Sequence, residues 1–238
     1  MLEARALSKQ FGSLTVIDGV DFRLGAAEAV GIVGPNGAGK TTLLNLLSGA
    51  MQPSAGQISY RETDIKAHDA AARCRLGIGR SHQVPRPFIG MTVFENVLVA
   101  AQQGGQAQGE DAYQRGVEAL QACGIIEHAN RRAETLGLLD RKRLELARAL
   151  ATKPAILLLD EIGGGLTDGE AEALVLIIQQ LRQRGIAIVW IEHIVHILVQ
   201  VVDRLICMDA GRIIADGPPS AVLENQAVIS AYLGGGVV

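Results

Sequence analysis

Aromatic residues are scarce in this sequence: phenylalanine, tryptophan and tyrosine make up 3% of its 238 residues. Because base-stacking surfaces are built from aromatic rings, this scarcity argues against a protein that binds single-stranded nucleic acid. The formal net charge is −3 and the isoelectric point lies near 6.0, so no global basic field favours a nucleic-acid partner either. We therefore expect no nucleic acid among the partners of this protein.

Cysteine is also rare, and the three cysteines form no CxxC pair. An odd number of widely spaced cysteines suits a reducing compartment, where we expect them to fill the core. No secretory leader is expected, because residues 1–10 carry charges in place of an apolar run. The most apolar stretch, residues 186–202, is interrupted by Glu192, two histidines and a glutamine, so we do not expect it to span a bilayer. Any role at a membrane is expected to come through a partner.

The most informative stretch is glycine-rich and lies between Val30 and Leu44. It fits the pattern GxxxxGK[ST], with an apolar strand before it and a leucine-rich helix beginning near Thr41 after it. In such a loop backbone N–H groups surround phosphate oxygens, Lys40 reaches the β- and γ-phosphates, and the Thr41 hydroxyl ligates Mg²⁺. The alternative is a plain glycine turn, but the flanking pattern favours a nucleoside triphosphate site. The residues expected to bind the nucleotide are Gly34, Asn36, Gly37, Ala38, Gly39, Lys40, Thr41 and Thr42.

A second pattern is an apolar run from Ala155 that ends in two carboxylates, Asp160 and Glu161. Such a run is typical of a parallel strand that is buried on both faces, and ligands of open α/β sheets bind at the carboxyl ends of the strands. We therefore expect Asp160 to hold Mg²⁺ and Glu161 to activate the attacking water, unless both acids only cap a strand. His193 ends a later strand, where it could contact a γ-phosphate, although a lone histidine is more often structural.

The length of the chain fits one α/β domain with a sizeable core, although two domains are an alternative. The N-terminal strands are expected to form an antiparallel piece with a turn at Phe11 and Gly12. The proline loop at 85–87 is expected to be a hinge or a binding loop, and the Gly/Gln-rich segment 102–109 to be flexible. The expected strands are 2–7, 20–24, 57–60, 77–81, 155–160, 186–191 and 204–208. The expected helices, besides the one near Thr41 and one after His193, are 92–102, 111–123, 140–151, 168–184 and 221–233.

Several motifs in a fixed order resemble the ATP-binding cassette (ABC) transporter ATPases, and the likeness covers essentially the whole chain. They are the phosphate-binding loop, Gln83, a basic helix led by Leu136, the Leu159-Asp160-Glu161 run and His193. The resemblance implies that ATP and Mg²⁺ are bound, that Phe11 stacks on adenine and that Gln83 senses Mg²⁺ and the water. It also implies that Glu161 is the catalytic base and that His193 contacts the γ-phosphate. Without the resemblance, Phe11 would be a turn-packing residue and Gln83 a surface residue.

The resemblance further implies a P-loop NTPase (RecA-like) core of the α/β class, with an antiparallel β piece and an inserted α-helical subdomain. We expect one ABC ATPase domain over residues 1–238. Its nucleotide-binding core would comprise residues 1–89 and 154–216. The helical subdomain would be residues 90–153, and residues 217–238 would form a helical tail.

Three segments, at residues 91–97, 190–193 and 228–234, are similar to the ATPases of branched-chain amino-acid importers. This implies two membrane permease subunits, a second ABC ATPase subunit that is identical or different, and indirectly an extracytoplasmic solute-binding protein. The chain would be cytoplasmic and peripheral on the inner face of the plasma membrane. Related systems carry urea, amides or aromatic acids, so the solute does not transfer with the resemblance.

One motif departs from the family. Where members carry Leu-Ser-Gly-Gly-Gln, this chain has Leu136, Gly137, Leu138, Leu139 and Asp140. In the family this signature grips the γ-phosphate on the opposite subunit, and here the serine hydroxyl and two glycines are missing. A carboxylate about 4 Å from that anion is repelled by roughly 1 to 4 kcal/mol, unless Asp140 is a helix N-cap that points elsewhere. Ile162 and Thr167 are smaller departures, from proline and from aspartate or asparagine.

The altered signature leads to a hypothesis of unequal sites. Paired with a relative whose signature is intact, the site built on Lys40, Asp160 and Glu161 would hydrolyse well and the opposite site weakly. A homodimer would instead have low turnover. Besides a transport ATPase, the alternatives are a soluble ABC protein of repair or translation and an unrelated P-loop kinase or GTPase. The single cassette argues against the second class, and the lack of an NKxD motif argues against a GTPase.

Overall fold

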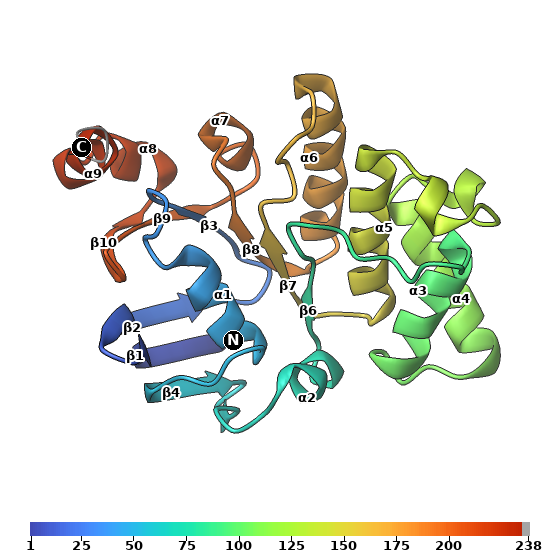
Figure 1. Cartoon of the computed structure of the whole chain (residues 1–238), viewed down its shortest axis with the longest axis horizontal. Coiled ribbons are helices and arrows are strands. Elements are labelled where there is room, and N and C mark those ends of the chain that lie inside the picture. The colour runs from blue at the N-terminus through green and yellow to red at the C-terminus, as the bar shows by residue number, and fades with distance from the viewer. Residues whose placement is uncertain (235–238) are drawn as a thin grey trace.

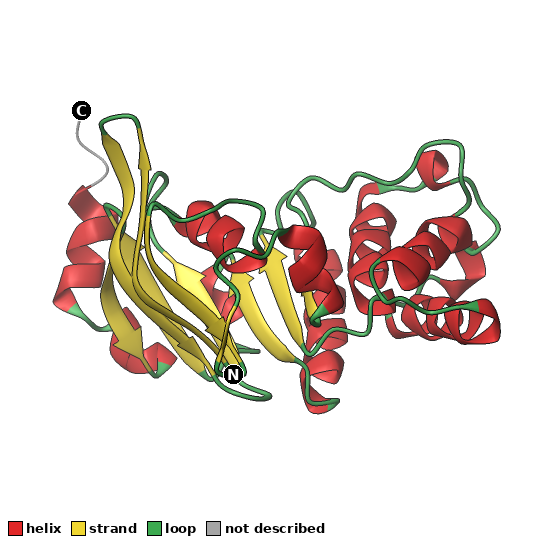
Figure 2. Ribbon diagram, turned by 90° about the horizontal axis from the view of Figure 1, so that it is seen from below, coloured by secondary structure: helices red, strands yellow, loops and turns green. Residues whose placement is uncertain are grey.

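The structure is a computed structural model that describes residues 1–234. Two β-sheets lie side by side, and a lobe of helices lies beyond the second sheet (Figure 2). The first sheet is antiparallel with the strand order β2-β1-β4-β5, and the second has the order β10-β9-β3-β8-β7-β6. This is the α/β fold that the sequence predicts, with a largely parallel sheet and a separate antiparallel piece.

The first sheet consists of β1 (Leu2–Phe11), β2 (Leu14–Leu24), β4 (Ala55–Tyr60) and the short β5 (Thr63–Asp64). Strands β1 and β2 are longer than predicted. Ala6 has φ of 46°, and the pairing of β1 with β2 shifts register between Ala4 and Leu7. This irregularity interrupts the alternation of buried and exposed residues on which the prediction depended. Phe11 is consequently the last residue of β1 and lies outside the turn.

The centre of the second sheet is β3 (Ala29–Val33), which lies between β8 (Ala187–Ile191) and β9 (Arg204–Asp209). Strands β7 (Ile156–Asp160) and β6 (Ile78–Arg80) complete the parallel part, and β10 (Arg212–Gly217) pairs antiparallel with β9. Every residue of β3, β7 and β8 is buried. The prediction of a parallel strand buried on both faces near 155–160 is therefore confirmed, and the strand predicted at 186–191 is buried in the same way.

Helix α1 (Lys40–Ser48) lies between the two sheets (Figure 1). Its four leucines, Leu43, Leu44, Leu46 and Leu47, are fully buried in a core that β1, β3 and β7 share. Burial of four leucines contributes about 6 to 12 kcal/mol of transfer free energy. Because β3 is fixed in the sheet and α1 is fixed by these leucines, the glycine-rich loop between them is held at both ends.

The helical lobe contains α3 (Val93–Gln103), α4 (Gly109–Ala122) and α5 (Leu138–Ala151), which pack on one another (Figure 1). Two 3-10 turns, η1 (Ile126–His128) and η2 (Ala133–Thr135), connect α4 to α5. Helices α6 (Asp168–Gln183) and α7 (Val195–Leu198) share a core with the face of the second sheet that is opposite α1. The N-terminus of α5 is thereby presented near the loop that follows β7, because Leu138 lies beside Gly165.

The short elements are the ones that the sequence did not predict: α2 (Ala70–Arg75), β5, η1 and η2. The tail also differs, since a single helix at 221–233 was expected and two are observed, α8 (Pro219–Leu223) and α9 (Gln226–Gly234). The chain turns between them at Asn225, whose side-chain oxygen accepts the Ala227 N–H at 2.8 Å. The end of the predicted tail, residues 235–238, lies outside the described residues. Over residues 1–234, no helix is both long and apolar enough to cross a membrane.

Candidate functional site

The glycine-rich loop between β3 and α1 has a backbone that only glycine permits at two of its positions. Gly34 has φ of +146°, and a Cβ there would lie 2.1 Å from the backbone oxygen of Met208 in β9. Gly39 has φ of +97°, and a Cβ there would lie 2.8 Å from the backbone oxygen of Val16 in β2. The loop is therefore packed between strands of both sheets, and its glycines are required by this close approach.

A cavity of about 270 Å³ lies over this loop. It is bounded by residues 36–42 of the loop and of α1, and also by Glu161, which lies far along the chain. Phe11 does not line this cavity: it lies at the end of β1 with 47% of its surface exposed, and Lys9 is 5.2 Å from its ring centre. Val16, which sequence reasoning missed, lines the cavity in place of an aromatic residue. Of the residues expected to bind the nucleotide, those at 36–42 line the cavity, whereas Phe11 and Gly34 do not.

The ammonium group of Lys40 lies inside the loop. Its Nζ donates to the backbone oxygens of Gly34 at 2.7 Å and Pro35 at 3.0 Å, and the residue is 6% exposed. Burial lowers the pKa of Lys40, while the charges of Glu161 and Asp160 act to raise it. A cation held at this depth, next to the N-terminus of α1, gives the cavity a positive field that suits phosphate groups.

Asp160 at the end of β7 faces α1. Its Oδ1 lies 3.5 Å from the Thr41 hydroxyl, and its Oδ2 accepts a hydrogen bond from Arg80 at 3.0 Å. Burial raises the pKa of the Asp160 carboxyl, and the Arg80 guanidinium opposes this shift. Two neighbouring oxygen ligands of an octahedral Mg²⁺ lie about 3 Å apart, so the hydroxyl and carboxylate oxygens are of the right kind and spacing for this ion.

Arg80 is a residue of this site that sequence reasoning missed. Besides Asp160, its guanidinium donates to the side chains of Asn45 at 2.6 Å and Ser48 at 3.0 Å, both on α1. It therefore joins the helix that follows the phosphate-binding loop to the strand that carries Asp160. An arginine at the end of a predicted strand was the available signal, but its partners became visible only in three dimensions.

Glu161 contacts side chains from two other loops. Its carboxylate accepts from Gln83 Nε2 at 2.5 Å and lies 2.8 Å from His193 Nε2. Glu161 has φ of 46°, a left-handed conformation that is uncommon for a residue with a side chain. This turn at the end of β7 directs the carboxylate toward the loop cavity, which it lines. The structure thus brings Gln83, Glu161 and His193, which are far apart in sequence, into direct contact.

The chain matches known protein families in its sequence. The family described as "ABC transporter" matches residues 17–163, and the family described as "Branched-chain amino acid ATP-binding cassette transporter" matches residues 212–238. The chain belongs to the ABC transporter family. It is an ATP-binding cassette, and its ATPase assignment is confirmed at the family level. A nucleotide is its ligand, as the loop predicts.

Relatives of this cassette cover nearly its whole length. It is 37% identical to the high-affinity branched-chain amino acid transport ATP-binding protein LivG of Salmonella typhimurium, over 98% of each chain. It is 33% identical to the corresponding protein BraF of Pseudomonas aeruginosa, also over 98% of each chain. A crystal structure of an ATP-binding cassette of an ABC transporter in its ADP conformation superposes with a TM-score of 0.89 at 28% identity, over 98% of each chain. These relatives favour a transport ATPase over the repair, kinase and GTPase alternatives.

The altered signature of this cassette begins helix α5. Gly137 is the N-cap and the helix starts at Leu138, so the reading of Asp140 as an N-cap is wrong. Asp140 lies in the first turn, where its carboxylate is 3.3 Å from His128 and 3.5 Å from Arg143. Its charge is therefore directed into the helical lobe, whereas Leu138 is 45% exposed. Gly137, Leu138, Leu139 and Asp140 are not part of the cavity over the cassette's own loop.

The last helix of the cassette contacts the phosphate-binding loop. The hydroxyl of Tyr232 in α9 accepts the backbone N–H of Gly34 at 2.9 Å, and burial raises the pKa of this tyrosine. Sequence reasoning used Tyr232 only as part of a similar C-terminal segment and did not place it at the site. No periodicity or spacing signal links residues 34 and 232, so this contact is a result of the tertiary fold.

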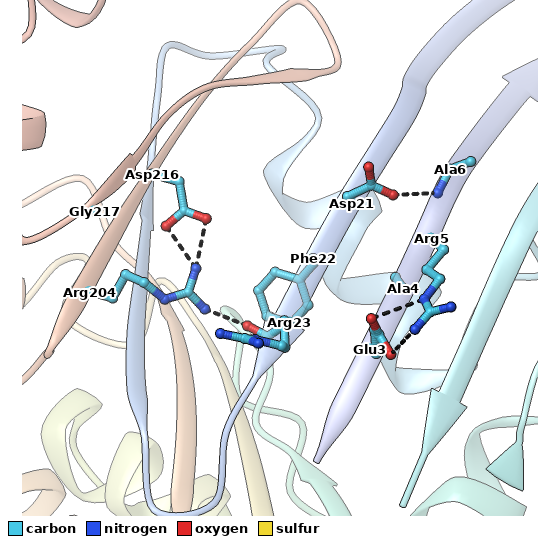
Figure 3. Close-up of a pocket in the computed structure, with 10 residues that line it drawn as sticks. All are labelled: Glu3, Ala4, Arg5, Ala6, Asp21, Phe22, Arg23, Arg204, Asp216 and Gly217. Carbon is cyan, nitrogen blue, oxygen red and sulfur yellow. Dashed lines mark hydrogen bonds and ion pairs between the residues drawn. The ribbon is translucent and has the colours of Figure 1, made fainter. Parts of the chain in front are cut away.

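A second hollow in the cassette, of about 610 Å³, lies between β1, β2 and the β9-β10 hairpin. Figure 3 shows that its charged side chains, apart from that of Arg23, are engaged with one another or with the backbone. Glu3 pairs with Arg5, Arg204 pairs with Asp216 and donates to the Arg23 backbone oxygen, and Asp21 accepts the Ala6 N–H. Because these charges compensate each other locally, the hollow lacks the concentrated positive field of the phosphate-binding loop.

Proposed function

We propose that this cassette hydrolyses ATP to drive an importer of branched-chain or related amino acids. The observation that carries the enzymatic part is the meeting of Glu161, Gln83 and His193 at the rim of the cavity above Lys40. The transport part is supported by the names of LivG and BraF and by the C-terminal match to branched-chain amino acid cassettes. The solute itself is expected to be chosen by other chains of the complex.

In the proposed site, backbone N–H groups of residues 36–42 and the Lys40 ammonium bind the ATP phosphates. Thr41, Asp160 and Gln83 would hold Mg²⁺, which neutralises charge on the phosphates. The carboxylate of Glu161 accepts a proton from the attacking water, and His193 donates to the γ-phosphate while it orients Glu161. Phe11, which is exposed at the end of β1, is the proposed stacking partner of adenine.

The proposed partners follow from the cassette architecture. Two cassettes would close around ATP, with Leu138 and Leu139 facing the opposite phosphate, and would separate after hydrolysis. The lobe of α3, α4 and α5, within the proposed subdomain 90–153, would carry this motion to membrane permeases fed by an extracytoplasmic solute-binding protein. The core would be residues 1–89 and 154–216, with residues 217–238 as the tail. The chain would lie on the cytoplasmic side of the plasma membrane.

Co-purification tests this proposal. The full chain is tagged at its N-terminus, with Glu161→Gln to retain bound ATP, and recovered from detergent-solubilised membranes in ATP and Mg²⁺. Permease subunits and a second ATPase should accompany it, and vesicles with the unsubstituted complex should accumulate radiolabelled leucine when ATP is supplied. Recovery of the chain without any membrane protein would contradict the transport role. Undiminished ATP turnover in the Glu161→Gln variant would contradict the assigned catalytic base.

A further inference from the structure

Glu192 is a buried carboxylate that the proposed hydrolysis does not use. It immediately precedes His193 at the end of β8 and is 2% exposed. Its Oε1 accepts the backbone N–H of Gly163 at 2.5 Å, and its Oε2 accepts the N–H of His193 at 3.2 Å. Gly163 lies two residues after Glu161. One side chain thus bonds to the backbone beside each of the two groups that meet at the catalytic site.

The Glu192 carboxylate packs closely against position 163. A Cβ on Gly163 would lie 2.9 Å from Glu192 Oε1 and 3.3 Å from its Cδ. Gly163 has no left-handed φ, so backbone conformation alone does not require glycine there. A side chain at position 163 would therefore have to displace the Glu192 carboxylate, which is buried.

A lysine from the helical lobe approaches the same place. Lys142 of α5 is 4% exposed, and its Nζ lies 3.5 Å from the backbone oxygen of Glu161. Burial lowers the pKa of Lys142, while the charges of Glu192 and Glu161 act to raise it. The helix that begins with the altered signature therefore places a cation at the turn of Glu161, where its charge also acts on Glu192.

We propose that Glu192 is a positioning residue, which ties the backbone after Glu161 to the backbone before His193 and so keeps the Glu161 carboxylate and the His193 imidazole in contact. Lys142 connects α5 to the same backbone, so that a movement of the helical lobe displaces Glu161 and His193 together. This inference rests on the proposed roles of Glu161 and His193. Displacement of a catalytic group by about 1 Å lowers turnover by up to a hundredfold, which makes such a link consequential.

A size-swap pair of variants tests the link in the full-length chain, with whatever partners co-purify. Gly163→Ala introduces the Cβ that meets Glu192, and Glu192→Asp withdraws the carboxylate by about 1.5 Å. We expect Gly163→Ala to lower kcat at least tenfold with KM for ATP within twofold of the unsubstituted protein. Addition of Glu192→Asp should then restore kcat to within threefold. Gly169→Ala is the matched control, because a Cβ there meets no atom within 4 Å.

Two results would overturn the inference: a kcat of Gly163→Ala within twofold of the unsubstituted protein, or a double variant whose losses simply multiply. Melting temperatures of all variants separate a loss of folding from a loss of positioning, and rescue by a second substitution excludes general damage. Glu161→Gln is measured in parallel. If that variant is inactive while Gly163→Ala is fully active, only the positioning role fails; if Glu161→Gln retains turnover, the proposed function fails.

Discussion

His193 Nε2 lies 2.8 Å from Glu161 Oε1, although the two residues are separated by 32 positions in the chain. The reason is the register of two neighbouring parallel strands, in which Asp160 of β7 pairs with Ile191 of β8. Because both strands end at the same level of the sheet, the residues that follow them leave the sheet together. The contact is therefore a direct consequence of strand order.

Replacement of His193 should separate binding from turnover. We expect His193→Ala to lower kcat about a hundredfold, because Glu161 loses its orienting partner and the γ-phosphate loses a donor. Affinity for ATP, measured by equilibrium binding, should change less than threefold, since the loop and Lys40 are untouched. His196→Ala is the matched control, because His196 is exposed and lies three residues further on. Equal effects of the two substitutions would contradict this role.

The altered signature should act through its leucines and not through its charge. Asp140 is engaged by His128 and Arg143, so Asp140→Gln is expected to leave ATP turnover within twofold. Leu138 and Leu139 occupy positions where the family has glycine, so Leu138→Gly with Leu139→Gly should raise turnover of a homodimer several-fold. Steady-state ATPase rates check both outcomes. A large gain from Asp140→Gln alone would show that repulsion of phosphate dominates.

If the partner is a different cassette with an intact signature, the two ATP sites of the pair should hydrolyse ATP at unequal rates. Glu161→Gln in this chain should then abolish most turnover of the pair, because this site faces the intact signature. The corresponding substitution in the partner should have little effect. The comparison is made on the co-purified complex, and equal losses from the two substitutions would exclude the asymmetry.

Arg73 should be essential for stability although it lies outside the candidate site. It is fully buried and donates to five backbone oxygens, including those of Leu46 and Leu47 at the end of α1. Burial lowers its pKa to about 10. Arg73→Met leaves these acceptors without a donor, which we expect to cost about 3 to 5 kcal/mol, or roughly 10 °C in melting temperature. Arg75→Met, at an exposed position, should shift the melting temperature by less than 2 °C, or about 0.5 kcal/mol.

Glu192 should make stability depend on pH in a predictable direction. Burial raises the pKa of its carboxyl, while the Gly163 and His193 N–H groups act to lower it. Between its unfolded pKa, near 4.5, and this raised value, the native protein binds more protons than the unfolded chain, so the free energy of unfolding falls as pH rises. Glu192→Gln removes the titrating carboxyl and, with it, this pH dependence of the free energy of unfolding. The melting temperature of the variant relative to the unsubstituted protein should therefore increase from pH 4 to pH 7.5, and a constant difference would contradict the shift.

The sequence was most informative where burial is complete. The strand before the loop and the run ending in Asp160 were predicted because β3 and β7 are apolar on both faces, which leaves an unbroken pattern. The phosphate-binding loop was predicted because glycine, lysine and threonine at fixed spacing have few other uses. At these positions the local sequence pattern and the tertiary structure favour the same element, so a short stretch of sequence is enough to predict it.

Other features depend on partners that a sequence window does not contain. The bulge at Ala6 hid the true length of β1, and the clamp made by Arg80 requires Asn45, Ser48 and Asp160 together. Asp140 was a candidate N-cap in the sequence, but Gly137 caps the helix and the Asp140 carboxylate lies beside His128 and Arg143. Tertiary contacts thus decided each of these cases.

The position of β3 has a consequence for synthesis of the chain on the ribosome. Ala29 of β3 pairs with Ile188 of β8, and Val30 pairs with Arg204 of β9. The Tyr232 hydroxyl accepts a hydrogen bond from the loop after β3. The nucleotide loop therefore emerges early, while the strands that flank β3 are translated more than 150 residues later. A nascent chain must keep β3 and the leucines of α1 from aggregating until nearly the whole sequence has emerged. Premature termination before β9 should accordingly yield protein that binds chaperones and not nucleotide.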